Sequence, residues 1–465
     1  MNDYVKAAIL LAAYFVAGPM IGIAIAGKRH LERGVFCLMV FMTAWLPSKI
    51  TLTLGSIDTY RGHTKGFEGS LIEVLAIALI VAAARTRGPG FRLLPPGTLP
   101  YLGWCGLMLF SLLHAYSPVH VWMAFTKFSM AVLLYIAGSH FLRDERDLAA
   151  LLRTMAGMVI LMMLVCLKMR LLDHKFRTVG WFEHQNPMAM WSYFAAMPLL
   201  ALGLRAETPQ RDALLYFAGT GAAGINVILS VSRGALGAFA IGCAAVMFLA
   251  YLRGPSKRLI AATILGSIAG VLVAATTMNS VFARMKEEKA RDGEEDLRVV
   301  MIAQARAMLA DSATGIGWNN YGIANSRPIE RYSLIMEEWD ASRGFRIYEE
   351  NYVANPLTES YYWLILGENG YPGIIGCALF FAWTLWMCGR CTARYWKTGP
   401  GWFAGGVLVA IALHYAHSQL ERVLTQTKNL SLWLLILGVV AGLEARRRAG
   451  KPQPFATPAA PPRRN

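Results

Sequence analysis

Two segments of the sequence carry arginines whose surroundings suit the binding of phosphate groups. Arg233 stands in ILSVSRGALGAFAIG, between two strongly apolar runs, with Ser232 before it and Gly234 after it. Arg298 and Arg306 are eight residues apart, so a helix would carry both on one broad face. A guanidinium is always charged and grips phosphate through two parallel hydrogen bonds. These arginines predict an anion site. The alternative for Arg233 is an interface side chain that extends towards water.

The stretch TESYYWLILGENGYPGIIG, residues 358–376, places two carboxylates in an apolar segment that has no basic residue. Its ENGYPG part is typical of a helix break at a membrane boundary, which favours a structural role for Glu368. Glu359 is expected on a short helix before this break, together with Tyr362 and other aromatic residues that could hold a sugar. Because they are nine residues apart, the two carboxylates need not meet in the fold.

Further polar side chains gather in three short segments beside apolar runs. GWFEHQNPM crowds polar residues just before Pro187, which suits either a binding site or the capped first turn of a helix. GIGWNNYG combines a flexible backbone with side chains able to bind sugar, and DTYRGHTKGFEGS adds charged residues. The candidate substrate-binding residues in these segments are His184, Asn186, Trp318, Asn319, Arg61 and Glu68.

A metal site is not predicted. His414 and His417 share a helix face with Glu421, but no third strong ligand is evident, so buried hydrogen bonding is the preferred interpretation. The sequence has no phosphate-binding Walker loop, no glycine-rich dinucleotide fingerprint and no HExxH pair. An ATP-driven pump is therefore not expected, nor is a cofactor.

The composition is that of a helical membrane protein with many spans. Of 465 residues, 55% are hydrophobic and only 16% are charged, with a mean hydropathy of +0.41. A soluble domain is usually about 25% charged. Apolar runs near the roughly 20 residues that cross a bilayer recur along the chain. The sequence therefore predicts an all-α polytopic fold with about 12–13 transmembrane helices, and nothing suggests an alternating barrel pattern.

The net charge of +16 comes largely from short basic loops between the apolar runs. This is the positive-inside pattern, which indicates cytoplasmic loops rather than a nucleic-acid surface. It puts the N-terminus outside and the C-terminus inside, or both inside if the first span is re-entrant. The expected spans are 6–27, 34–54, 70–86, 99–116, 120–141, 147–168, 186–204, 212–231, 233–252, 258–277, 371–389, 402–420 and 427–444.

The spans divide the chain into four parts. Residues 1–277 carry transmembrane helices 1–10, and residues 278–358 form one large outward loop, which at that length is usually functional. Residues 359–444 hold a re-entry helix and the last three transmembrane helices, and 445–465 form a Pro-rich, disordered cytoplasmic tail. Within the large loop, an amphipathic helix is expected to lie across the outer membrane surface. Its apolar residues are Leu297, Val300, Met301, Ala305, Met308 and Leu309.

The order of these motifs resembles the O-antigen ligase and O-antigen polymerase superfamily of bacterial membrane glycosyltransferases. SRGALGAF resembles the family's Ser-Arg-Gly at the start of a span. LRVVMIAQARAMLADSATGIGWNNYG resembles its helix with a leading arginine and a Gly-x-Gly loop. ESYYWLILGENGYPGIIG resembles its His-Asn-x-Tyr-Leu, Glu-x-Gly and Gly-hydrophobic series, and GWFEHQNPMAM resembles its Asn-Pro segment. The resemblance runs from about residue 180 to residue 376.

The resemblance implies glycan transfer on the periplasmic face of the bacterial inner membrane, with inversion at the sugar carbon. The donor would be a glycan on undecaprenyl diphosphate, without a nucleotide sugar or a metal. By this resemblance Arg233 and Arg298 would hold the diphosphate leaving group. The types and positions of Arg306, Ser232 and Tyr362 make them further substrate-binding candidates. The expected partners are the lipid-linked oligosaccharide donor, a glycan acceptor and membrane lipids, and the resemblance allows a flippase and a chain-length regulator.

One departure from the family pattern bears on the reaction. The family's catalytic histidine, counted back from Glu-x-Gly, falls on Glu359 here, which could still deprotonate a hydroxyl as a general base. We associate histidine most with ligases, so the sequence favours a polymerase of exopolysaccharide or O-antigen repeat units. The alternative is a ligase that transfers the glycan to lipid A-core. A polysaccharide transporter or flippase is less favoured, because no matching halves are found. A structural membrane subunit is the least favoured alternative.

Overall fold

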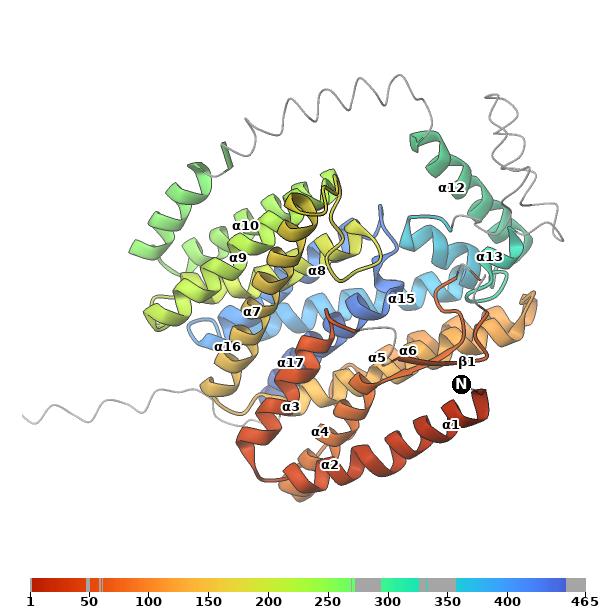
Figure 1. The fold of residues 1–465 in the computed structure, drawn as a ribbon, viewed down its shortest axis with the longest axis horizontal. Coiled ribbons are helices and arrows are strands. Elements are labelled where there is room, and N and C mark those ends of the chain that lie inside the picture. Colours follow the sequence, from red (N-terminus) through yellow and green to blue (C-terminus); the bar gives the residue numbers. More distant parts are fainter. Residues whose placement is uncertain are drawn as a thin grey trace, which may run out of the picture.

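The computed structural model describes residues 2–46, 51–57, 60, 62–268, 270–271, 294–325, 332 and 357–448, which are mostly α-helical (Figure 1). Among these residues, nine helices are long and apolar enough to cross a membrane, which confirms the all-α polytopic fold. They are α1–α2 (Asp3–Ile25), α6 (Pro118–Phe141), α7 (Glu145–Leu171), α8 (Gln185–Leu204), α9 (Gln210–Ser230), α10 (Arg233–Arg253), α15 (Tyr361–Arg394), α16 (Gly399–His417) and α17 (Thr427–Arg448).

Shorter elements complete the bundle. Two strands, β1 (Thr51–Leu54) and β2 (Phe67–Ser70), pair antiparallel. The first span is α1 (Asp3–Ala12) and α2 (Gly18–Ile25), joined through a π-helical turn. The other helices are α3 (Arg29–Met42), α4 (Leu71–Arg87), α5 (Thr98–Met108) with a 3-10 extension to His114, α12 (Glu294–Asp311) and α13 (Tyr321–Ala324).

The expected span 34–54 is wrong in its second half. Helix α3 ends at Met42, and Thr51–Leu54 forms β1 instead, opposite Phe67–Ser70. The reason lies in TLTL, where β-branched threonines alternate with leucines, a pattern that suits a strand. At the tenth expected span, 258–277, residues 257–268 and 270–271 are helical, and the remainder lies outside the described residues.

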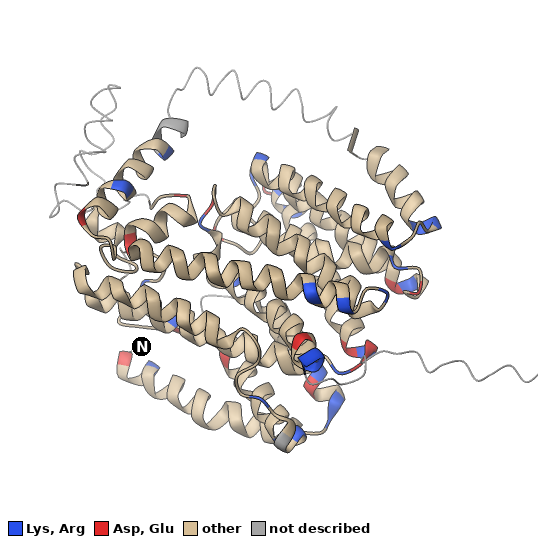
Figure 2. Ribbon diagram, turned by 180° about the vertical axis from the view of Figure 1, so that it is seen from behind, with Lys and Arg blue, Asp and Glu red and all other residues tan. Residues whose placement is uncertain are grey.

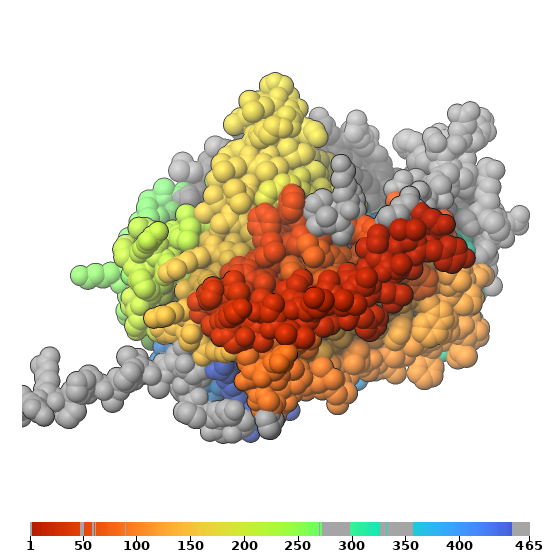
Figure 3. Space-filling view, turned by 60° about the horizontal axis from the view of Figure 1, so that its bottom comes forward, coloured from red at the N-terminus to blue at the C-terminus, as the bar shows by residue number. Residues whose placement is uncertain are grey.

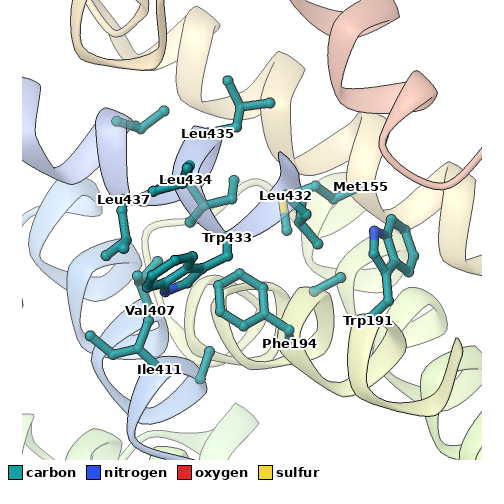
Figure 4. Close-up of a cluster of buried hydrophobic side chains, with 14 of the residues drawn as sticks. Met155, Trp191, Phe194, Val407, Ile411, Leu432, Trp433, Leu434, Leu435 and Leu437 are labelled. Atoms are coloured by element: carbon teal, nitrogen blue, oxygen red, sulfur yellow. The ribbon is translucent and has the colours of Figure 1, made fainter. Parts of the chain in front are cut away.

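The core lies where α8, α16 and α17 meet. The window of α8 that could cross the membrane is buried on every side, as expected for a helix that is apolar all round. Figure 4 shows Phe194 of α8 beside Trp433 of α17, with Ile411 of α16 on one side and Trp191 of α8 on the other, near Met155 of α7. The first span, by contrast, lies on the outside of the bundle, where it crosses one face in Figure 3.

The two ends of the bundle differ in charge. Lysines and arginines gather mainly at the end away from α12 and the N-terminus (Figure 2). At that end the buried carboxylate of Asp147 pairs with Arg33 at 2.8 Å and with Arg29. Glu32, also buried, pairs with Arg143 at 3.0 Å. This distribution agrees with the short basic loops of the sequence, since they collect on one side of the predicted membrane.

Helix α15 is broken where the sequence predicts it. Gly370 has φ 60° and ψ −155°, so it interrupts the helix, and a side chain there would meet the carbonyl oxygen of Ala313 at 2.1 Å. The expectation for Glu359 is corrected by one detail. Helix α15 begins at Tyr361 with Ser360 as its extended N-cap, so Glu359 precedes the helix instead of lying on it.

Glu368 ties the outer loops to the break in α15. Its side chain is fully buried and accepts hydrogen bonds from the backbone N–H of Asn319 at 2.9 Å and of Tyr321 at 3.0 Å. The same carboxylate lies 2.5 Å from Nε2 of His63, and its backbone oxygen accepts from the N–H of Gly317 at 3.0 Å. Glu368 therefore connects three segments that are far apart in the chain.

We expect Glu368→Ala to destabilise the protein. The substitution leaves two buried backbone N–H groups and His63 without their acceptor, which costs on the order of 3 kcal/mol. The check is the unfolding temperature of the purified protein in detergent, with Glu183→Ala as control because Glu183 is exposed in a loop. Equal unfolding temperatures for the two variants would contradict the structural role of Glu368.

Candidate functional site

Two of the predicted catalytic residues meet directly. Nε of Arg298, on α12, lies 2.7 Å from Oε2 of Glu359, just before α15. Both side chains are nearly half exposed, at 48% and 42%, so a ligand can reach them. An always-charged cation and a carboxylate therefore stand together. Helix α12, which carries the cation, lies at the end of the bundle away from most of the basic residues (Figures 1 and 2).

The apolar face of the helix that carries Arg298 was expected to meet the membrane, but it meets protein. Helix α12 packs on α15. Met301, Ala305 and Met308 are buried, and Ala305 and Met308 join a small apolar cluster that includes Leu364. The apolar face finds a protein partner, and burying it there fixes Arg298 over Glu359.

A second carboxylate, Glu421, joins this pair from the loop after α16. The side-chain amide of Asn186, at the start of α8, donates to Oε1 of Glu421. The backbone N–H of Tyr361 donates to the carbonyl of Ser418 at 2.9 Å, so the chain just after Glu359 lies against the chain just before Glu421. Burial and the nearby Glu359 raise the pKa of Glu421 to about 7.

Arg422 is the residue of this site that sequence reasoning missed. It is partly buried, which lowers its pKa, while Glu359, Glu421 and Glu368 act electrostatically in the opposite direction. Arg422 therefore stands among carboxylates from three segments. The signal in the sequence was the adjacent opposite charges in QLERVL, at the outer end of an apolar run, where charged residues are costly.

Arg233 opens α10, as the sequence predicts. Ser232 is the N-cap residue of α10, and its Oγ accepts from the N–H of Ala235 at 3.4 Å. Gly234 packs against His417, because a Cβ at this position would lie 2.9 Å from Nε2 of that histidine. The start of α10 therefore meets the end of α16, and a helix N-terminus attracts anions.

His184 and Asn186 form the capped start of α8, one of the two roles that the sequence left open. His184 is the N-cap of α8, with Nδ1 accepting from the N–H of Asn186 at 3.4 Å. Burial lowers the pKa of His184, while Glu359 acts to raise it, so the ring lies within the electrostatic reach of the site. The cap therefore lies near the pair of Arg298 and Glu359.

The aromatic residues of the site are turned into the protein. The hydroxyl of Tyr362 donates to the carbonyl of Tyr415 at 2.7 Å. The guanidinium of Arg306 lies 5.0 Å from the ring centre of Trp363, which is the distance of a cation–π contact. Arg306 shares α12 with Arg298, but in this state it covers an aromatic ring.

Three other predicted substrate-binding residues lie apart from this cluster. Trp318 and Asn319 are buried, and the side chain of Asn319 donates to the carbonyl of Thr64 at 3.1 Å, so both serve packing around Glu368 in this structure. Glu68 lies beside Lys127, with 3.7 Å between Oε2 and Nζ. A fourth predicted substrate-binding residue, Arg61, lies outside the described residues.

The two histidines of α16 are held by aromatic contacts. Nδ1 of His417 lies 3.3 Å from the hydroxyl of Tyr193, and the ring of His414 packs against Phe194. Within the part of the chain that the structure describes, no group of three or more His, Cys, Asp or Glu side chains could hold a metal ion.

The cluster can bind an anion and move a proton. Arginines from α10, α12 and the loop after α16 supply positive charge, and two carboxylates stand among them. Such groups suit a reaction in which a phosphate-bearing group leaves and a hydroxyl loses its proton.

The comparison with known families agrees with this geometry. Residues 218–378 match the family model described as O-antigen ligase, a segment that includes Arg233, Arg298 and Glu359. No curated protein matches the chain. Members of this family are membrane enzymes of glycosyl transfer related to O-antigen polysaccharide. The match over this segment supports the O-antigen ligase and polymerase superfamily.

Proposed function

We propose that this protein is a polymerase that joins oligosaccharide repeat units carried on undecaprenyl diphosphate into exopolysaccharide or O-antigen. The observation that carries the proposal is the contact of Arg298 with Glu359, within the segment that matches the family. It puts a group able to hold the leaving diphosphate beside a group able to take the proton of an attacking hydroxyl.

The reaction would run in one displacement. The hydroxyl oxygen of the acceptor sugar attacks the anomeric carbon of the donor, and the bond from that carbon to the phosphate oxygen breaks. The diphosphate leaves with the electron pair, and the hydroxyl proton passes to a carboxylate, for which we propose Glu359. Attack from the side opposite the leaving group inverts the anomeric centre.

Arg233 and Arg298 would stabilise the charge that develops on the diphosphate. Both stand at the same end of the bundle, and Arg233 adds its charge to the N-terminus of α10. Positioned positive groups lower the barrier most when they face charge that grows during the reaction. In this mechanism the leaving group is stabilised by side chains of the chain itself, and no metal is proposed.

The charge distribution supports an orientation. The basic end of the bundle would face the cytoplasm of a bacterial inner membrane, since basic loops stay on that side. The site lies at the other end and would face the periplasm, where lipid-linked glycans are accessible. The ligase remains the second candidate, because the matching family model carries that description.

The polymerase and the ligase give different products when the gene is deleted. We expect the mutant cell to leave single repeat units on its acceptor, because a polymerase is missing. Gel separation of the surface glycans shows the result. Normal-length chains that stay unattached would contradict the polymerase and support the ligase.

The arginines can be tested in purified protein supplied with a lipid-linked oligosaccharide. We expect Arg233→Ala and Arg298→Ala each to slow the growth of the polymer ladder by about 10²–10³-fold, because each removes a stabilising donor. Arg85→Ala is the matched control, since Arg85 is an exposed arginine in the last turn of α4, outside the site. Ladder growth at the control rate in both site variants would refute the anion site.

Glu359 is tested in the same assay. Glu359→Gln keeps the size of the side chain but cannot accept the hydroxyl proton, so we expect a loss of about 10²-fold or more. Rapid mixing and sampling of the first transfer separates this step from product release. Full activity of the Gln variant would show that another group takes the proton.

A further inference from the structure

The loop after α16 places a second carboxylate in the site, and the proposed mechanism has not used it. Glu421 receives a hydrogen bond from Asn186 through Oε1. The backbone bond from Tyr361 to Ser418 holds the two carboxylate-bearing segments side by side.

Glu359 and Glu421 share one cation. Arg298 bonds directly to Glu359 and also acts electrostatically on Glu421. Two carboxylates that lie near each other disfavour each other's charged form, and a cation between them relieves that repulsion. The charge state of Glu421 therefore depends on where Arg298 is directed.

The other charged groups around Glu421 come from four elements. Arg422 is its neighbour in the loop, and His417 lies one turn back on α16. His184 caps α8, and Arg233 opens α10, whose next residue touches His417. Of these groups, Arg422 and Arg298 stabilise the ionised form of Glu421, and Glu359 disfavours it.

We propose that Glu421 and Glu359 act as a carboxyl pair that senses the donor through Arg298, because the diphosphate of the donor draws Arg298 away from Glu359. Donor binding then prepares the base before the acceptor hydroxyl attacks. This inference rests on the proposed function, since it needs a diphosphate in the site. Glu421 is a positioning residue in this account, because it acts through Glu359.

The charges around Glu421 determine the direction in which its pKa changes when the donor binds. Burial and Glu359 raise the pKa of Glu421 to about 7, and Arg298 opposes this rise. When the negative diphosphate neutralises Arg298, the opposition weakens and the pKa of Glu421 rises further. At pH 7.5 a carboxylate that is mostly ionised would then take up part of a proton. During transfer, the proton that leaves the hydroxyl goes to this pair as the carbon–oxygen bond to the diphosphate breaks.

The test measures protons exchanged when undecaprenyl diphosphate binds to the full-length protein in detergent. Titration calorimetry at pH 7.5, in buffers of different ionisation enthalpy, gives the number of protons per ligand bound. We expect Glu421→Gln to bind the ligand but to take up fewer protons than the wild type. Gln keeps an oxygen that can accept from Asn186, which favours correct folding. Glu183→Gln, on an exposed loop, is the matched control and should behave as the wild type.

The pH profile of the first transfer is a second measurement. If Glu421 had only a structural role, the position of this profile on the pH scale would not change. Without the charge of Glu421, we expect the rise of the rate with pH to shift to lower pH, with a rate loss of about 10²-fold at pH 7.5. Glu421→Asp keeps a carboxylate and should recover part of both properties. It also keeps the test open if the Gln variant folds poorly.

The outcomes separate the two proposals. Ligand binding with equal proton exchange in the wild type and Glu421→Gln, together with an unchanged pH profile, would overturn the carboxyl pair alone. No binding of undecaprenyl diphosphate and no polymer from lipid-linked oligosaccharide in the wild type would overturn the proposed function. Fewer protons taken up in the Gln variant and a shifted profile would support the pair.

Discussion

The buried carboxylate of Glu368 is the constraint on which the outer end of the bundle depends. Glycines at the break in α15 let the backbone of α15 and that of residues 313–317 come together, and Glu368 then accepts from two N–H groups of the chain that follows. A polar group in an apolar bundle must find partners inside the protein, because membrane lipid offers none. The same hydrogen bonds give the carboxylate of Glu368 its donors and give the backbone N–H groups of the loop their acceptor.

This arrangement fixes the reactive groups indirectly. The loop held by Glu368 follows α12, and α12 packs its apolar face on the first part of α15. As a result Arg298 lies over Glu359, while the bond from Tyr361 to Ser418 draws in the loop with Glu421 and Arg422. Packing therefore assembles a site of opposite charges from helices that are far apart in sequence. Because positive and negative side chains are close in number there, the charged groups can stand together at one end of the bundle.

The sequence predicted what local chemistry determines. Hydropathy gave the helical class, the break near Gly370 followed from ENGYPG, and the start of α10 at Arg233 followed from its serine and glycine neighbours. The sequence did not predict which surfaces would pack against other parts of the protein. The sequence pattern of the apolar face of α12 is the same whether that face meets lipid or α15. The sequence of the Trp-Asn-Asn loop likewise does not tell whether its side chains are exposed or, as in the structure, buried. Arg422 was missed because its role depends on carboxylates brought in by tertiary packing.

The central claim is that Arg298 passes from Glu359 to the diphosphate of the donor. The most direct measurement is an electron cryomicroscopy structure of the protein with undecaprenyl diphosphate bound in lipid nanodiscs. The account predicts phosphate density against Arg298 and near Arg233, with the contact between Arg298 and Glu359 broken. Phosphate density elsewhere, with Arg298 still 2.7 Å from Glu359, would contradict it.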